Sequence, residues 1–321
     1  MSITDRSVLV VGGTGFIGRV LLGRLNYHGF RTTALAFLDR GQAERLTDFA
    51  GLNVLPAASS ELTDLVASLS DQRFDYIINL SSGGVRPEDR SPAALEKSNS
   101  VFLVRLLEAV AACAPRLFVH AGSWSEYAPP QDRIPILEGH PLQFGTGYGG
   151  AKSIAERNGL ACAVGLGIPF VTLRLFHVYG PGEADHRLTP YLMSSLAAGC
   201  VADLSSGDQV RDFLFVDDVA DAFIAALSSG RMIADSAYNV CSGIPVSVRH
   251  VSQMFCDTLG CSHDMLRFGA LPARPDEAPW VVGDGTLFEK ATGWRPEHTL
   301  EQGLRKTMSL SRTEGGSDGW I

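Results

Sequence analysis

The feature that most constrains this chain is a glycine-rich segment near its start, VLVVGGTGFIG. Four apolar residues, Val8–Val11, predict a buried strand, and Arg19–Leu25 has the pattern of a helix. In a turn between strand and helix, Gly12 allows a tight bend, Gly15 lets the backbone approach a pyrophosphate, and Gly18 allows close helix packing. The spacing, G-x-x-G-x-x-G, favours a dinucleotide-binding turn. The alternative is a glycine-rich turn of another α/β protein.

Composition limits what such a chain can be. Its 321 residues suit one large domain with a smaller lobe, and 45% hydrophobic residues are enough for a sizeable core. The formal charge of −8 argues against a nucleic-acid partner, although local arginines can hold a small anion. No stretch resembles a signal peptide or reaches the roughly 18 apolar residues of a membrane span. The six cysteines have no paired spacing, so we expect reduced thiols and a cytoplasmic protein.

Strand and helix patterns alternate along the chain. They predict an α/β fold, a Rossmann-type doubly wound parallel sheet with helices on both faces. A strand over Asp75–Leu80 ends at Ser81 and Ser82, and ligands of such sheets bind beyond the carboxyl ends of the strands. A long amphipathic helix over Ala93–Cys113 follows and carries Asn99. We therefore expect the functional residues to follow the strand ends.

The end of the predicted second strand, Arg31–Leu38, bears on the choice of cofactor. An acidic residue about 20 positions beyond the glycines binds the ribose 2′-hydroxyl of NAD, and that position here holds Ala36 or Phe37. Asp39 and Arg40 follow slightly later. A missing acid with an arginine nearby favours NADP(H), whose 2′-phosphate needs a cation. The alternative is that Asp39 reaches the ribose and the cofactor is NAD(H).

A further group of residues has the pattern of an acid–base site. The strand predicted over Leu117–Ala121 delivers Ser123 to the same sheet edge, and a helix begins at Tyr148. Tyr148 and Lys152 are four residues apart and so lie on one helical face. A nearby ammonium favours the phenolate, and such a tyrosine exchanges a proton with a carbonyl or carbinol oxygen. Y-x-x-x-K alone is typical of a surface pair, but its combination with the glycine turn and Ser123 is not.

Together these motifs resemble the extended short-chain dehydrogenases/reductases, in the branch that acts on nucleotide-activated sugars. The resemblance covers nearly the whole chain. It rests on GGTGFIG at 12–18, Ser123, YGGAK at 148–152, LRLFHVYGPGE at 173–183, RDFLFVDDVADA at 211–222, NVCSG at 239–243, ARPDE at 273–277 and TGWRP at 292–296. It implies a homodimer, formed by the helix after Pro92 and the helix that begins near Tyr148.

The resemblance implies a role for each residue at the sheet edge. Tyr148 is the general acid/base, Lys152 holds the nicotinamide ribose and tunes the tyrosine, and Ser123 orients the substrate oxygen. The expected cofactor-binding residues are Gly12, Gly15, Phe16, Ile17, Gly18, Asp39, Arg40, Leu80, Ser81, Ser82, Tyr148 and Lys152. No metal is expected, because the acids of VDDVAD lie at the start of a helix predicted over Val216–Leu227, where the helix dipole favours them.

The implied substrate is a nucleotide-activated sugar held by the second half of the chain. The expected contacts are Ser123, Trp124, Ser125, His177, Arg211 and Arg274. His177 stands where relatives usually have asparagine, and the alternative is a loop histidine without a ligand. Arginine suits a diphosphate because its planar fork bonds two oxygens at once. Each arginine also has an acidic neighbour, so the alternative is a surface ion pair, Arg211 with Asp212 or Arg274 with Asp276.

The resemblance also divides the chain. Residues 1–176 are expected to form the NADP(H)-binding Rossmann domain, to which a segment at about 207–233 returns. Residues 177–310 are expected to form a smaller C-terminal α/β lobe that binds the sugar nucleotide. The tail at 311–321 is polar and rich in glycine, so we expect it to be disordered.

The residues after Ser123 discriminate among the reactions of this family. Its 4,6-dehydratases carry an Asp-Glu pair directly after the serine or threonine, whereas this chain has Trp124 and Ser125. Without that pair no acid and base are evident for eliminating water, so we do not expect a dehydratase. The absent acid after the second strand favours a ketoreductase that reduces C4 of a nucleotide-linked 4-keto-6-deoxy sugar with NADPH. The alternatives are a nucleotide-sugar 4-epimerase that retains NAD, and a regulator that binds NADP without chemistry.

Overall fold

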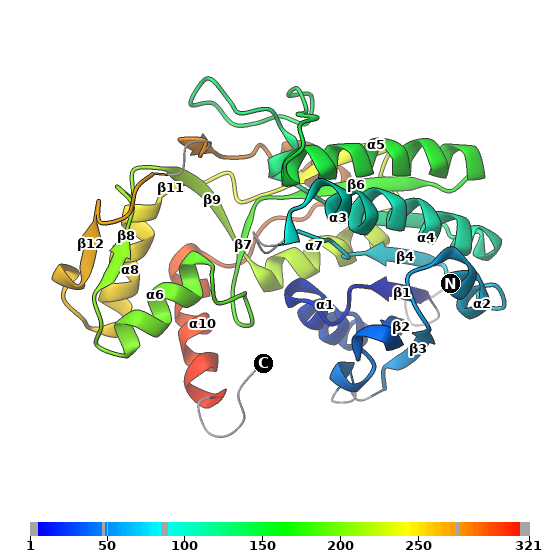
Figure 1. The fold of residues 1–321 in the computed structure, drawn as a ribbon, viewed down its shortest axis with the longest axis horizontal. Coiled ribbons are helices and arrows are strands. Elements are labelled where there is room, and N and C mark those ends of the chain that lie inside the picture. Colours follow the sequence, from blue (N-terminus) through cyan, green and yellow to red (C-terminus); the bar gives the residue numbers. More distant parts are fainter. Residues whose placement is uncertain (1–5, 47–48, 50, 85–88, 274–276, 315–321) are drawn as a thin grey trace.

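The computed structural model describes residues 6–46, 49, 51–84, 89–273 and 277–314, of which 311–314 by their backbone alone. Its largest element is a seven-stranded parallel sheet in the order β10-β6-β5-β4-β1-β2-β3 (Figure 1). The strands are β1 (Ser7–Val11), β2 (Arg31–Phe37), β3 (Asn53–Ala57), β4 (Tyr76–Asn79), β5 (Leu117–Ser123), β6 (Phe170–Leu175) and β10 (Ser236–Val240). The predicted Rossmann-type α/β fold is therefore confirmed.

Helices cover both faces of this sheet because its central strands are apolar on both sides. Along β1, Val8 and Val10 point into one core while Leu9 and Val11 point into the other, as the alternation of a strand requires. The first core is covered by α1 (Phe16–Tyr27) and α7 (Val216–Ser228), and the second by α2 (Leu62–Leu69), α4 (Phe102–Val110) and α5 (Tyr148–Leu166). Both layers are visible in Figure 1.

The helix predicted over residues 93–113 is one helical rod with a π-helical turn in its middle. It consists of α3 (Pro92–Leu95), the π-helical turn Glu96–Val101, α4, and a 3-10 turn at Ala111–Cys113. Asn99 lies in the π-helical turn, and its Nδ2 donates to the carbonyl oxygen of Leu95 at 2.9 Å. Such turns often occur at functional sites because they alter the direction of a side chain. Here the turn places Asn99 against the loop after β4.

A smaller lobe stands beside the large sheet (Figure 1). One of its sheets contains β7 (His177–Tyr179), β9 (Val210–Phe215), β11 (Pro245–Ser247) and β13 (Trp280–Val281), and the other pairs β8 (Ala202–Leu204) with β12 (Leu266–Phe268). Its helices are α6 (Leu188–Ala197), α8 (Val248–Leu259) and α10 (Leu300–Glu314), while α9 (Thr286–Thr292) packs near α7 and β10. Leu192, Phe215, Phe255 and Leu304 form the centre of the lobe's core.

Two chain boundaries differ from the expected ones. The segment expected to return to the Rossmann domain was 207–233, but β9 belongs to the smaller sheet, and the chain rejoins the large sheet through α7 and β10. The tail was expected to be disordered from residue 311, but α10 continues to Glu314. The helix persists because Leu304 and Met308 bury one of its faces in the lobe's core. Residues 315–321 lie outside the described part of the chain.

The acids at the start of α7 each have a separate structural partner. Asp217 pairs with Lys306, Asp218 accepts the backbone N–H of His298 at 3.2 Å, and Asp221 pairs with Arg24. Within the described ranges, no three His, Cys, Asp or Glu side chains gather as a metal would require. Nor does any helix among them combine the length and apolar character needed to cross a bilayer.

The pair between Arg24 and Asp221 links α1 to α7 and is open to a direct test. Nε and Nη2 of Arg24 both donate to the Asp221 carboxylate, which is 20% exposed. Removing either partner leaves a half-buried charge, so we expect Arg24→Ala or Asp221→Ala to lower the free energy of unfolding by about 1–3 kcal/mol. The double variant is expected to recover part of this loss because neither charge then remains unpaired.

Urea denaturation of the four proteins measures this coupling. Arg305→Ala is the control, because its partner Glu301 lies four residues away on the exposed face of one helix. It is expected to change the unfolding free energy by no more than about 0.5 kcal/mol. Strictly additive losses in the double variant would show that the two helices are not coupled through this pair.

Candidate active site

Tyr148, at the first position of α5, contacts the loop after β4. Its hydroxyl lies 3.2 Å from Oγ of Ser82, and that Oγ lies 3.2 Å from Oδ1 of Asn99. Oδ1 is an acceptor, because it also takes the backbone N–H of Gly83 at 3.2 Å. Ser82 therefore donates its single hydrogen to Asn99 and accepts the hydrogen of the phenol. The predicted general acid is thus held by a residue predicted to bind the cofactor.

Lys152 is buried one helical turn further on, with 1% of its surface exposed. Its Nζ donates to the carbonyl oxygen of Ala121 at 2.7 Å and lies 3.5 Å from Nε2 of His120. Burial, together with the charge of Lys152, holds the pKa of His120 well below its usual value, so the imidazole is neutral. The ammonium of Lys152 is therefore fixed against β5 without a competing cation on that strand.

Ser123 is the last residue of β5 and the N-cap of a 3-10 turn, Trp124–Glu126. Its N–H donates to Oε1 of Glu126 at 2.6 Å, and its Oγ accepts the N–H of Ser125 at 3.2 Å. The two serine Oγ atoms are 2.9 Å apart. This reciprocal arrangement is a capping box, whose S-x-x-E spacing could have identified Glu126 in the sequence. Two expected substrate contacts thereby present adjacent hydroxyls.

Two glycines after Tyr148 allow α5 to lie directly on this turn. A Cβ at Gly149 would lie 1.9 Å from the carbonyl oxygen of Ser125, and a Cβ at Gly150 would lie 1.9 Å from that of Gly145. Nε2 of Gln143 donates to the same Ser125 oxygen at 2.6 Å. No larger residue fits between the two elements. The two glycines of Y-G-G-A-K are therefore needed for the close packing at the start of α5.

The glycine turn has the shape that a dinucleotide requires. Gly12 has φ of 84°, and a Cβ there would lie 2.9 Å from the backbone nitrogen of Ser81. A Cβ at Gly18 would lie 2.2 Å from the carbonyl oxygen of Gly12. α1 begins at Phe16, before the predicted start, and its N-cap Gly15 supplies no side-chain acceptor. The first N–H groups of the helix are thus able to bind an anion, which fits the pyrophosphate of a nicotinamide dinucleotide.

The other expected cofactor residues surround this turn. Phe16 and Ile17 are partly buried against the core of the smaller lobe, and Leu80 against the core of the large sheet. Ser81 donates its N–H to Oδ1 of Asn79 at 3.1 Å. These contacts place the glycine turn between the sheet and the lobe.

Asp39 and Arg40 lie side by side just beyond β2, which ends at Phe37. Both belong to a 3-10 turn, Leu38–Arg40, and both are about half exposed. Nε of Arg40 is 3.9 Å from Oδ1 of Asp39, and the guanidinium lies 5.3 Å from the centroid of the Phe37 ring. An acid and a cation are therefore presented together at the edge where such folds bind the adenosine ribose.

Trp124 and His177 form a stacked pair. The pair connects the turn Trp124–Glu126, the candidate catalytic turn, to the smaller lobe. Their ring centroids are 4.8 Å apart at an interplanar angle of 24°. Burial, and then the charges of Arg211 and Arg187, hold the pKa of His177 well below its usual value. Its Nδ1 is buried and has no hydrogen-bond partner among the residues described. His177 is therefore a neutral imidazole beside this turn whose Nδ1 is unsatisfied among the residues described.

Of the two arginines expected to contact the substrate, the structure describes Arg211. Arg211 is 5% exposed and donates to Oε1 of Glu277 at 2.8 Å, not to its neighbour Asp212. The carboxylate of Asp212 instead accepts the backbone N–H groups of Ser242 at 2.7 Å and of Gly283 at 3.1 Å, which ties two loops to β9. Adjacent residues of a strand point to opposite faces, so this sequence pair does not form an ion pair. Arg274 lies outside the described residues.

Glu183 is a buried carboxyl that sequence reasoning missed. Burial raises its pKa to about 8, against the opposing effects of Arg187 and Thr189. Its Oε2 is buried and without a hydrogen-bond partner in the described part of the chain. A glutamate after G-P-G resembles an exposed loop residue in sequence, and only the fold shows its burial.

Comparison with known proteins identifies the family of the chain. The sequence matches the NAD dependent epimerase/dehydratase family over residues 8–241. This chain belongs to that family. It is accordingly an NAD(P)-dependent oxidoreductase of the extended short-chain dehydrogenase/reductase type, as its motifs predicted.

Family members resemble the chain over nearly its full length. A dTDP-6-deoxy-L-talose 4-dehydrogenase (NAD(P)(+)) of Kitasatospora kifunensis is 31% identical over 95% of this chain and 96% of that protein. A CDP-abequose synthase of Salmonella typhimurium is 26% identical over 96% and 99%. The structure of a Thermotoga maritima UDP-glucose 4-epimerase with UDP-glucose has a TM-score of 0.84 and 22% identity, covering 96% of this chain and 99% of that one. That last likeness shows the shared fold.

In this family member, the turn after Ser123 presents no exposed carboxylate. Trp124 stacks on His177, and Ser125 bonds to Ser123. The one acid of the turn, Glu126, is fully buried and points into the protein. The Asp-Glu pair expected of the 4,6-dehydratases is therefore replaced in this turn by a stacked tryptophan and a hydrogen-bonded serine.

The packing of α5 on the catalytic turn gives a second prediction. Gly149→Ala is expected to displace Tyr148 and Lys152, and to lower turnover of a nucleotide-sugar substrate by about 100-fold, because small displacements of catalytic groups have effects of that size. The matched control is Gly165→Ala in the same helix, where an added Cβ meets nothing within 4 Å. The control is expected to retain turnover and to gain about 0.5–1 kcal/mol in stability. Equal turnover in the two variants would contradict this role of Gly149.

Proposed function

We propose that this chain reduces the 4-keto group of a nucleotide-linked 4-keto-6-deoxy sugar with NADPH. The observation that carries the proposal is that Tyr148 contacts the loop after β4 while Lys152 and Ser123 lie at the end of the neighbouring strand β5, beside a turn without an exposed carboxylate. Reduction of a ketone needs the first feature and not a carboxylate pair. The likeness to a dTDP-6-deoxy-L-talose 4-dehydrogenase supports it, because the reverse of a 4-dehydrogenation is a 4-ketone reduction.

The residues of the chain supply the proton side of this reaction. The turn Gly12–Gly18 and Lys152 would hold NADPH, which would supply the hydride that C4 gains. The Ser123 hydroxyl donates a hydrogen bond to the ketone oxygen, and Tyr148 gives its phenolic proton to that oxygen as C4 becomes an alcohol carbon. The ammonium of Lys152 stabilises the remaining phenolate. The hydrogen of Ser82, now directed to Asn99, can turn to the same phenolate.

A nucleotide-sugar 4-epimerase that retains NAD is the second candidate. Asp39 beside Arg40 is the observation that favours it, because a carboxylate at this edge binds the ribose hydroxyls of NAD. A UDP-glucose 4-epimerase of Mycolicibacterium smegmatis is 26% identical to this chain over 95% of its length and 98% of that protein. The two candidates differ in whether the cofactor is consumed and released, and that difference is measurable.

Replacing the phenol tests the catalytic assignment. Tyr148→Phe removes the proton donor, so we expect NADPH oxidation with a 4-keto-6-deoxy sugar nucleotide to slow by about 100- to 10,000-fold. Binding of NADPH, followed by thermal shift, is expected to persist because the glycine turn is unchanged. Tyr27→Phe, at a residue that is 86% exposed, is the control and is expected to match the wild type. Turnover of Tyr148→Phe within a few-fold of the wild type would contradict the assignment.

The state of the cofactor distinguishes the two candidates. We expect the purified protein to release no stoichiometric NAD on denaturation and to be stabilised more by NADPH than by NADH in a thermal-shift assay. Arg40→Ser is expected to remove that preference, because the 2′-phosphate loses its cation. Asp39→Ser is the control at the adjacent position. Stoichiometric release of NAD would instead support the epimerase and assign Asp39 to the ribose.

A further inference from the structure

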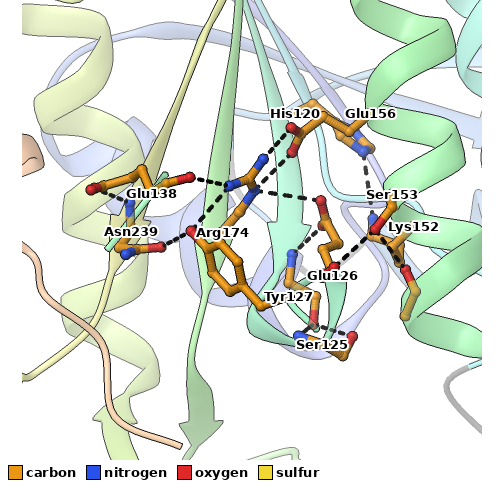
Figure 2. A network of polar contacts seen from close by, with 12 residues as sticks. His120, Ser125, Glu126, Tyr127, Glu138, Lys152, Ser153, Glu156, Arg174 and Asn239 are labelled. Carbon is orange, nitrogen blue, oxygen red and sulfur yellow. Dashed lines mark hydrogen bonds and ion pairs between the residues drawn. The ribbon is translucent and has the colours of Figure 1, made fainter. Parts of the chain in front are cut away.

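Glu126 is the last residue of the turn Trp124–Glu126, and its side chain lies between Arg174 and Lys152 (Figure 2). It is fully buried, and its Oε1 accepts the backbone N–H of Ser123 at 2.6 Å. Its Oε2 has no hydrogen-bond partner among the described residues, and Nε of Arg174 lies 3.6 Å away. A buried carboxylate oxygen that receives no hydrogen bond is costly. The ionisation state of Glu126 therefore matters for the turn that carries Ser123.

Arg174 already has a carboxylate partner. Its Nε donates to Oε2 of Glu156 at 3.1 Å, and its Nη2 donates to Oε1 of the same residue. Its Nη1 donates to the hydroxyl of Tyr127 at 3.0 Å and to the carbonyl oxygen of Glu138 at 3.3 Å. Figure 2 shows the guanidinium surrounded by these groups. The single charge of Arg174 is thus matched by the single charge of Glu156, which receives both of its parallel hydrogen bonds.

We propose that Glu126 acts as a neutral carboxylic acid that positions Ser123. Its Oε1 accepts the N–H of Ser123, and its Oε2, which accepts no hydrogen bond itself, carries the proton that the neighbouring carboxylate of Glu156 can accept. Burial, and then the charge of Glu156, raise the pKa of Glu126 well above its usual value despite Lys152 and Arg174. The inference rests on the proposed function, because Ser123 is the residue that holds the ketone oxygen there.

The groups that face Glu126 come from three elements. Glu156 and Lys152 lie on α5, Arg174 lies on β6, and Tyr127, the next residue along the chain, follows the 3-10 turn. Loss of the proton from Glu126 would place a second negative charge beside Glu156 and remove the hydrogen bond between the two carboxyl groups. We therefore expect alkaline pH to loosen the turn that fixes Ser123 and to lower kcat.

Three variants test whether Glu126 is a neutral acid or a carboxylate. Glu126→Gln keeps an acceptor for Ser123 and a donor for Glu156, so kcat is expected to stay close to that of the wild type. Glu126→Leu removes the acceptor and is expected to lower kcat by about 100-fold without weakening NADPH binding, because the hydroxyl of Ser123 is displaced. Glu138→Gln, on the far side of Arg174, is the control and is expected to retain kcat. A large loss of kcat in Glu126→Gln would overturn the proposal.

The pH dependence of stability gives a readout that needs no substrate. A folded-state pKa above the unfolded value means that Glu126 stabilises the fold fully at acid pH and loses this contribution as pH rises through the raised pKa. Glutamine does not ionise, so the Tm of Glu126→Gln is expected to rise relative to that of the wild type as pH increases from the ordinary glutamate pKa of 4.5 to the raised pKa of Glu126. The alkaline decline of kcat is expected to weaken in this variant.

Replacing the other carboxyl group, Glu156, shows which of the two carries the proton. Glu156→Gln removes the counter-charge of Arg174 and is expected to lower Tm more than Glu126→Gln does. The reverse ranking, or a Tm difference between Glu126→Gln and the wild type that is constant with pH, would overturn the proposal. A wild-type protein that reduces no 4-keto sugar nucleotide would refute the proposed function, while these Tm measurements would still decide the state of Glu126.

Discussion

The active edge of this protein depends on the contact between the backbone of α5 and the turn after β5. The helix carries Tyr148 and Lys152, and β5 ends at Ser123, so the proposed catalytic residues belong to different elements. The contact at Gly149 and the hydrogen bond from Lys152 to Ala121 fix the helix to β5 at two points. Two such points define the helix position along the strand and its rotation, which is what acid–base chemistry at one oxygen requires.

The sequence was most informative where neighbouring residues determine structure, as in β1, the glycine turn and the start of α5. It was least informative where burial depends on distant residues. Glu126 resembles a surface acid until Arg174 and Glu156 are placed around it, and Arg211 finds its partner in Glu277 rather than in adjacent Asp212. Apart from β9, the strands of the smaller sheet have only two or three residues, too few for their periodicity to be recognised.

Neutral imidazoles line the site beside its cations. His120 lies next to Lys152, and His177 is influenced by Arg211 and Arg187, yet burial keeps both rings uncharged. A charged ring at either place would repel the neighbouring cation. The positive charge beside these rings therefore comes from the lysine and the arginines and not from the imidazoles, in a chain whose net charge is −8.

The last strand of the large sheet has a consequence for synthesis of the protein. β10 pairs with β6, but the smaller lobe's β7, β8 and β9 are made between them. Until residue 240 has left the ribosome, the edge of β6 keeps a row of unpaired backbone groups. Helix α7, which covers the same face of the large sheet as α1, is completed only shortly before β10. An open edge of this kind is a template for pairing with other chains. Slow translation across the lobe would therefore prolong exposure of the nucleotide-binding half to aggregation.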